Sequence, residues 1–223
     1  MFANLVRTVL AKRTRRALKF DLQRLRTRVR SVFHTPDAAS RQLHLGCGGR
    51  LVPGFLNVDV FASEHDVDLG SGVLPWRNSS FDVVVSQQVI EHLELDSQLR
   101  PLLAELHRVL GAGGEAWLAC PDMEAICRSY LADGGRALFD DRVSRWPTFS
   151  LGGLPPSQMV NVLFHQAGEH VNLFDFDLLS HLLRTAGFSR VTRVRESDLL
   201  QRFPGFPARN DDETSLYVCA TKA

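Results

Sequence analysis

The sequence contains little cysteine, and its four cysteines show no pairing pattern. Cys47, Cys120, Cys127 and Cys219 form no CxxC pair and no regular ladder of spacings, which argues against a disulfide framework and a cysteine-based zinc site. A long apolar run is also missing. The longest uncharged stretch, residues 146–168, is interrupted by prolines and glycines, so no segment resembles a membrane span. We therefore expect a protein of the reducing cytoplasm.

Apolar residues are frequent enough for one substantial core. Of the 223 residues, 44% are hydrophobic, which is consistent with one α/β domain and an appendage. The formal net charge of +1 conceals a division, because residues 1–33 carry ten lysines and arginines against a single acid, Asp21. This segment has a charge of +9 and the remainder −8. The charge pattern predicts a basic arm, residues 1–36, and an acidic domain, residues 40–223.

Apolar residues recur along the arm at helical spacing, as at Leu18, Leu22, Leu25 and Val29. This spacing predicts a basic amphipathic helix or a pair of them. Three interpretations stay open: docking of the apolar stripe on its own domain or a sister subunit with the arginines in solvent, contact with an anionic membrane surface, and nucleic-acid binding. The last is disfavoured because the rest of the chain is acidic and offers no second basic patch. The oligomeric state is not determined.

After Pro36 the pattern changes to strands alternating with helices. The apolar runs and turn signals predict strands over 42–45, 55–60, 81–86, 115–120, 191–194 and 216–221, and helices over 97–110 and 176–186. Such alternation predicts an α/β fold with a parallel, doubly wound sheet. Ligands bind such sheets at the carboxyl ends of the strands.

A glycine-rich turn, Gly46-Cys47-Gly48-Gly49, follows the first strand, and Asp59 ends the second. Glycines allow a ligand to approach the backbone, and a carboxylate at a strand end can bind a ribose diol, so the two elements predict a nucleoside site. A dinucleotide-dependent (NAD) oxidoreductase is disfavoured. Its third glycine is replaced by Leu51, and Asp59 follows the first glycine by 13 residues instead of about twenty. The short spacing predicts a loop, residues 50–54, in place of the first crossover helix.

Further motifs follow the glycine turn in a fixed order. They are Asp68-Leu69, Leu74-Pro75-Trp76, Asn78-Ser-Ser-Phe-Asp82-Val-Val, Val89-Ile-Glu-His92-Leu, Leu106-His-Arg-Val-Leu110-Gly-Ala-Gly-Gly114 and Ala186-Gly-Phe188. With His44-Leu-Gly-Cys-Gly48, this series resembles the class I S-adenosylmethionine-dependent methyltransferases, specifically the methyltransferase type 11 group. The resemblance implies a seven-stranded Rossmann-like sheet, a methyltransferase, and S-adenosylmethionine as its cofactor.

The same resemblance implies the cofactor contacts. The glycine turn would lie against the amino-acid end of the cofactor, Asp59 would hold the ribose hydroxyls, and Asp68 would accept from the adenine amino group. The alternative for Asp68 is a helix N-cap, and Asp82 is expected to support the start of its strand. The full set of expected cofactor-binding residues is Gly46, Cys47, Gly48, Asp59, Asp68, Leu69 and Gln87.

Methyl transfer from a sulfonium mainly requires alignment of the two reacting centres, but a hydroxyl acceptor benefits from a base. The candidate catalytic residues are His92, His170 and Glu169, with His165 in the same segment, because histidine titrates near neutral pH. Each also has a structural interpretation, such as capping a turn. No metal site is expected, because the Asp and His residues lack the spacing of metal ligands.

Residues 123–173 form an insertion that is expected to recognise the substrate. Its aromatic residues, which would either line a substrate surface or fill a core, are Tyr130, Phe139, Trp146, Phe149 and Phe164. A second segment, residues 203–207, is expected to form a loop that closes over the site. The favoured function is methyl transfer to an oxygen of a small molecule or a cell-surface glycan precursor. The alternative is a non-catalytic adaptor recruited to the inner membrane face by its basic arm.

Overall fold

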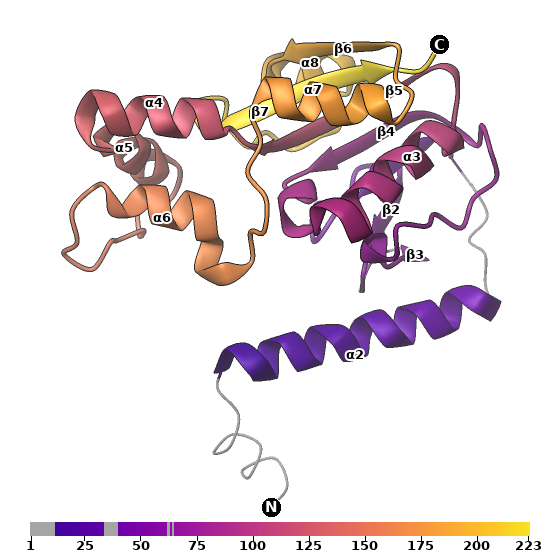
Figure 1. Ribbon diagram of the computed structural model, residues 1–223, viewed down its shortest axis with the longest axis horizontal. Coiled ribbons are helices and arrows are strands. Elements are labelled where there is room, and N and C mark those ends of the chain that lie inside the picture. The colour runs from indigo at the N-terminus through magenta and orange to yellow at the C-terminus, as the bar shows by residue number, and fades with distance from the viewer. Residues whose placement is uncertain (1–11, 34–39, 62, 64) are drawn as a thin grey trace, which may run out of the picture.

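A computed structural model describes residues 12–33, 40–61, 63 and 65–223, in which helices flank a seven-stranded sheet (Figure 1). The strands are β1 (Gln42–Leu45), β2 (Leu56–Asp59), β3 (His65–Asp66), β4 (Phe81–Gln87), β5 (Leu110–Pro121), β6 (Arg190–Val194) and β7 (Ser215–Thr221). The helices are α2 (Lys12–Phe33), α3 (Arg100–Val109), α4 (Met123–Asp133), α5 (Arg136–Arg145), α6 (Gln158–His165), α7 (Phe176–Thr185) and α8 (Glu196–Arg202). The predicted α/β, Rossmann-like fold of the class I methyltransferase type is confirmed.

The strand order is β3-β2-β1-β4-β5-β7-β6. All neighbours from β3 to β5 are parallel, whereas β7 runs antiparallel between β5 and β6, so the prediction of a parallel sheet is wrong for β7. The chain proceeds outward from β1 to β3 and then crosses back to β4, so the order reverses between β1 and β4. Such a reversal is where doubly wound sheets bind ligands. The carboxyl ends of β1, β2 and β4 therefore lie together at one edge of the sheet.

The two faces of the sheet pack against different cores because successive residues of a strand point to opposite sides. In β4, Val84 belongs to the larger core, which contains residues of α3 and α7. Val83 and Val85 face the opposite side and pack with Phe203 and Phe206. The segment 203–207 therefore fills the second core, and the prediction that it closes over the site is wrong. Burial of the Phe203 and Phe206 rings is favourable in free energy, whereas an exposed loop would leave them in water.

The first crossover is a loop, as the spacing predicts, and a buried amide holds it in place. Asn57 in β2 accepts from the Val52 N–H at 2.9 Å and donates to the carbonyls of Val52 and Phe55 at 3.1 and 3.0 Å. These bonds satisfy main-chain groups that no helix satisfies here. The loop therefore brings β2 into the sheet beside β1 within a few residues.

The glycine segment before β5 differs from its prediction. The helix predicted over 97–110 begins only at Arg100, and the strand predicted over 115–120 begins earlier, because residues 111–114 belong to β5. The pairing with β4 shifts register between Phe81 and Val83, as in a β-bulge. The Gly113 N–H donates to the carbonyl of Lys222, and the Lys222 N–H donates to Gly114. Gly113 and Gly114 therefore pair with Lys222 and extend the sheet.

The insertion forms a helical lobe of α4, α5 and α6 beside the sheet (Figure 1). The lobe has its own small core, with Ile126 and Met159 fully buried. Phe139, Phe149 and Phe164 pack against this core, whereas Tyr130 and Trp146 are about half exposed. Most of these aromatic side chains therefore stabilise the lobe, which was the second of the two interpretations.

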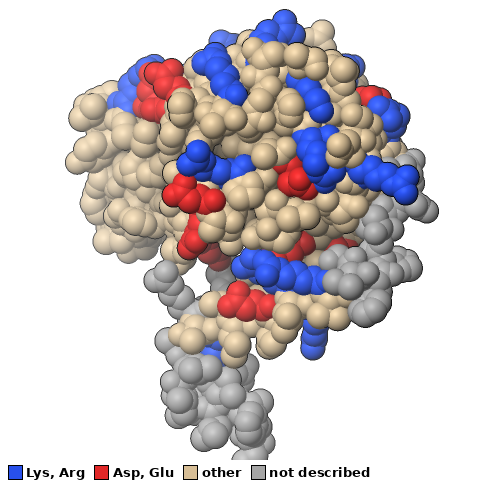
Figure 2. Space-filling view, turned by 45° about the vertical axis from the view of Figure 1, so that its right-hand side comes forward, with Lys and Arg blue, Asp and Glu red and all other residues tan. Residues whose placement is uncertain are grey.

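The arm helix α2 docks on the domain through its polar face. Arg24 and Arg28 each direct Nε to one oxygen of Asp68, at 3.0 and 2.6 Å, and the Thr27 hydroxyl donates to the Val60 carbonyl at 2.8 Å. Figure 2 shows basic and acidic side chains where this helix meets the domain. The apolar stripe points away from the domain, with exposed fractions of 48–58% at Leu18, Leu22, Leu25 and Val29. The helix therefore docks on its own domain, but the prediction that its apolar stripe makes this contact is wrong: Arg24 and Arg28 point inward because Asp68 binds them, and the stripe stays outside.

Removing both arginine contacts is expected to release α2. In an Arg24→Gln/Arg28→Gln variant the Asp68 carboxylate stays buried without a cationic partner, which is costly. We expect amide hydrogen exchange along α2 to become several-fold faster. The control is Lys19→Gln/Arg26→Gln, which removes two exposed charges of the same helix. Equal exchange in the two variants would contradict docking through Asp68.

Candidate functional site

The turn after β1 is held against the end of β2 by main-chain hydrogen bonds. The Gly46 and Cys47 N–H groups both donate to the Val58 carbonyl, at 2.8 and 3.0 Å. Gly46 has a φ of +68°, and a Cβ added there would lie 2.2 Å from Cγ2 of Val89. Residue 46 must therefore be glycine for two reasons, its conformation and its packing against the segment after β4. Cys47 is buried beside it, in accordance with a residue chosen for its small size.

Asp59 lies at the end of β2 and faces the same turn. Its Oδ2 accepts from the Gly48 N–H at 2.7 Å, and its Oδ1 accepts from the Val60 N–H at 2.6 Å. A carboxylate has about four lone-pair sites, so each oxygen keeps capacity for another donor. A Cβ added at Gly48 or Gly49 would meet nothing within 4 Å, so space remains open over the turn. This acceptor beside an open glycine backbone fits the ribose end of the predicted cofactor.

Asp68 has protein partners for both oxygens. Besides Arg24 and Arg28 it accepts from the Gly70 N–H at 3.1 Å, and so it caps the short helical turn Leu69–Ser71. The N-cap alternative is therefore what the structure shows, and an adenine amino group would have to share this carboxylate with two guanidinium groups. The contacts of Asp68, Leu69 and Gln87 with adenine or sulfonium stay predictions. Leu69 and Gln87 are both buried at this edge of the sheet.

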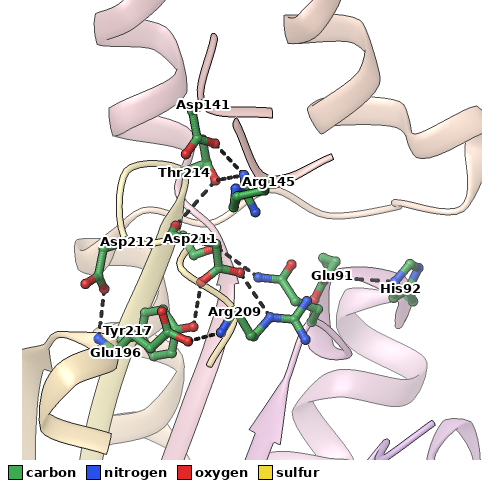
Figure 3. Close-up of polar contacts among 12 residues, drawn as sticks. Glu91, His92, Asp141, Arg145, Glu196, Arg209, Asp211, Asp212, Thr214 and Tyr217 are labelled. Atoms are coloured by element: carbon green, nitrogen blue, oxygen red, sulfur yellow. Dashed lines mark hydrogen bonds and ion pairs between the residues drawn. The ribbon is translucent and has the colours of Figure 1, made fainter. Parts of the chain in front are cut away.

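Three ligating side chains meet just beyond β4. The carboxyl group of Glu91 is fully buried, and its Oε1 lies 3.9 Å from Nε2 of His92 and 4.0 Å from Nε2 of His170. The two imidazole rings are 4.8 Å apart. Figure 3 shows Glu91 and His92 side by side. The structure thus brings together two of the predicted catalytic residues, whereas His165 lies exposed on the surface.

Both imidazoles are oriented by main-chain carbonyls. Nδ1 of His92 lies 3.0 Å from the carbonyl of Glu169, and Nδ1 of His170 lies 2.7 Å from the carbonyl of Leu163. A carbonyl only accepts, so each Nδ1 carries a proton, and Nε2 is the ring atom that offers a lone pair in the corresponding tautomer. Glu169, predicted as a catalytic side chain, contributes its carbonyl oxygen to this arrangement.

Glu91 is the residue that the sequence did not single out. Burial raises the pKa of its carboxyl group to about 8, and burial also lowers the pKa of His170. Both charged forms are therefore disfavoured. The main-chain carbonyl of Glu91 accepts from the N–H groups of Val171 and Asn172, at 2.9 and 3.2 Å. These bonds fix the His170 segment beside Glu91. The signal in the sequence that could have identified Glu91 is an acidic residue next to His92 within an otherwise apolar segment.

A second buried network lies beside this cluster (Figure 3). Asp211 accepts from the Tyr217 hydroxyl at 2.6 Å and from Nε of Arg209 at 3.0 Å, and Glu196 accepts from the Arg209 N–H. The charge of Arg209 favours the ionised form of Glu91, but less strongly than burial opposes it. Burial and the Asp211 carboxylate raise the pKa of Tyr217. The network thus places the Arg209 cation near Glu91, although the two side chains are not hydrogen-bonded to each other.

A family model described as a methyltransferase domain matches residues 62–118, a minority of the chain. No curated protein matches the sequence. Among solved structures, a Thermotoga maritima protein described as an S-adenosylmethionine-dependent methyltransferase and possible histamine N-methyltransferase is 15% identical, with 99% of both chains covered and a TM-score of 0.47. A Mesorhizobium loti S-adenosylmethionine-dependent methyltransferase is 17% identical, with 84% of this chain and 93% of that chain covered and a TM-score of 0.46. At these identities and TM-scores the structural likenesses carry no argument about the substrate.

The matched segment contains Asp68-Leu69, Leu74-Pro75-Trp76 and Val89-Ile-Glu-His92, which are among the motifs that carried the resemblance. This match agrees with the predicted methyltransferase type over residues 62–118. Methyltransferase is accordingly the enzyme class, and S-adenosylmethionine the cofactor, that the segment indicates.

Replacing Glu91 by glutamine is expected to remove a pH-dependent loss of stability. The pKa of Glu91 is raised from 4.5 to about 8 in the folded protein, so the folded state keeps a proton that the unfolded state releases between these values. The stabilising contribution is complete below pH 4.5 and is lost as the pH rises through about 8. Urea denaturation in chelator-treated buffer should therefore show the unmutated protein losing stability relative to Glu91→Gln over this range.

The control for this measurement is Glu94→Gln, which changes an exposed acid of the same segment. Its stability should follow that of the unmutated protein at each pH. Parallel pH profiles for Glu91→Gln and the unmutated protein would show that Glu91 does not keep its proton in the folded state.

Proposed function

We propose that this protein transfers the methyl group of S-adenosylmethionine to an oxygen of a small molecule or of a cell-surface glycan precursor. The observation that supports this proposal is the placement of two groups at one edge of the sheet. The open turn at Gly48 with Asp59 lies at the ends of β1 and β2, and the cluster of Glu91, His92 and His170 lies beyond β4. The first group suits a nucleoside, and the second suits an acceptor hydroxyl.

The residues divide the work as follows. Asp59 accepts hydrogen bonds from ribose hydroxyls, and the bare backbone at Gly48 leaves room for the cofactor. When bound, the cofactor supplies an electrophilic methyl group on a sulfonium that leaves readily. The Nε2 lone pair of either His92 or His170 takes the one proton that the acceptor hydroxyl loses as its oxygen bonds to the methyl group. The lobe of α4, α5 and α6 borders this side of the sheet (Figure 1) and supplies the surface that recognises the acceptor.

Calorimetry with S-adenosylmethionine tests the cofactor site. The unmutated protein should bind it, and Asp59→Ala should bind it about 10-fold to 100-fold more weakly, because each hydrogen bond to a charged group contributes about 1.5–3 kcal/mol. Asp82→Ala is the matched control, since Asp82 is an exposed acid paired with Arg41 at the start of β4. Absence of binding by the unmutated protein would refute the enzyme. Binding without turnover on any screened acceptor would favour the adaptor, and binding of NAD instead would favour the oxidoreductase.

A peripheral contact with an anionic membrane is the second proposal, and the arm supports it. The stripe of Leu18, Leu22, Leu25 and Val29 points away from the domain, and the exposed Lys19 and Arg26 lie on the same side of the helix. An apolar stripe with basic flanks suits the surface of an anionic bilayer. Within the described part of the chain, no helix has the length and apolar character needed to cross a membrane.

Vesicle flotation tests this contact. The protein should float with vesicles that contain phosphatidylglycerol, and Leu22→Gln/Leu25→Gln should reduce the bound fraction several-fold because it removes apolar area from the stripe. Leu131→Gln, a change at an exposed leucine of α4, is the control. Equal flotation of the two variants would refute the membrane contact. A dimer that the stripe variant abolishes would assign the stripe to a second copy of the chain.

A further inference from the structure

The cluster of Glu91, His92 and His170 has the composition of a metal site. Each residue offers one ligating atom, and these three atoms lie within 4.8 Å of one another; the two Nε2 atoms lie 3.9 and 4.0 Å from Oε1 of Glu91. Two histidines and a carboxylate form a common ligand set for zinc and for other divalent transition metals. The residues come from the segment after β4 and from the end of the insertion, so their spacing in the sequence does not reveal the set.

The orientation of the imidazoles is that of metal ligands. A histidine that binds a metal usually donates its other ring N–H to a carbonyl or a carboxylate, which fixes the tautomer and aims the free nitrogen. Nδ1 of His92 does this with the carbonyl of Glu169, and Nδ1 of His170 does it with the carbonyl of Leu163. Both Nε2 atoms then face the carboxyl group of Glu91.

Hydrogen bonding within the cluster does not account for this arrangement. Neither oxygen of the Glu91 carboxyl group, nor Nε2 of His170, has a hydrogen-bond partner among the residues that the structure describes. The separations of 3.9 and 4.0 Å from Oε1 of Glu91 to the two Nε2 atoms are too long for a hydrogen bond. Buried polar atoms without partners are rare and costly, so three of them around one point indicate a missing common partner.

We infer that Glu91, His92 and His170 bind one divalent transition-metal ion of the zinc class. Tetrahedral zinc with bonds of about 2.0–2.1 Å holds its ligand atoms about 3.4 Å apart, so the separations of 3.9 and 4.0 Å from Oε1 of Glu91 to the two Nε2 atoms would shorten by about 0.5–0.6 Å. Three protein ligands leave a fourth position open, which is the pattern of catalytic zinc sites.

The cluster is open to the ion from one side. The Glu91 and His170 side chains are almost completely buried, whereas that of His92 is 32% exposed, so the ion can reach the site past His92. A hydroxyl at the open position would lose its proton more readily, because a bound cation lowers its pKa. The ion would then replace the free imidazoles as the activating group. This last consequence depends on the proposed methyl transfer, but binding of the ion does not.

Zinc titration of the chelator-treated, full-length protein tests the site, without cofactor or acceptor present. Calorimetry should show one Zn²⁺ bound per chain, and thermal unfolding should shift to higher temperature as Zn²⁺ is added. Glu91→Gln keeps the volume of the side chain, and His170→Asn keeps a donor for the Leu163 carbonyl while removing Nε2. Each should weaken Zn²⁺ binding about 100-fold or more, because each removes a ligand. His165→Asn is the matched control, since His165 is exposed at the end of α6, and it should bind like the unmutated protein.

X-ray absorption at the zinc edge of the unmutated protein is independent of any variant that fails to fold. It should show two imidazole nitrogens and a carboxylate oxygen. Absence of Zn²⁺ binding, a sulfur ligand, or unchanged affinity in both Glu91→Gln and His170→Asn would overturn the site. Zinc binding by a protein that does not bind S-adenosylmethionine would leave this inference intact and refute the proposed function.

Discussion

One carbonyl, that of Val58, connects the parts of the site. By accepting from the N–H groups of both Gly46 and Cys47, it holds the glycine turn on the end of β2 and places the Gly48 N–H against the Asp59 carboxylate. The turn then approaches the segment after β4 so closely that only glycine fits beside Val89. The ends of β1, β2 and β4 can meet in this way because the three strands are parallel neighbours.

The close approach of the glycine turn to the segment after β4 also accounts for the burial of Glu91. The segment after β4 is enclosed by the core on one side and by residues 169–172 on the other, where two N–H groups bond the Glu91 carbonyl. A carboxyl group without hydrogen-bond donors is costly in such a place, and the protein tolerates it by keeping the proton on. Two imidazoles with free lone pairs lie beside this protonated acid. The cluster can either hold protons or, after the Glu91 carboxyl group loses its proton, bind a cation.

The arm illustrates how charge can reverse the usual orientation of an amphipathic helix. Asp68 is buried and already caps a helical turn, yet its carboxylate needs a cation, which α2 supplies through Arg24 and Arg28. The polar face of the helix is therefore drawn inward and the apolar stripe is left outside. The charge division of the sequence indicated an arm, but the helix pattern alone favoured an apolar inner face.

Local patterns in the sequence predicted six of the seven strands, the loop crossover at residues 50–54, and the pairing of the glycine turn with Asp59, because these depend on residues near one another in the chain. The two-residue strand β3 was not predicted. The start of β5 was predicted wrongly because tertiary pairing adds residues 111–114 to the strand. The role of residues 203–207 was predicted wrongly because Phe203 and Phe206 are buried in the second core. Only the tertiary structure decided that Glu91 and His170 meet. The physical reason is that their contact is made by packing between distant segments, for which no local periodicity or spacing exists.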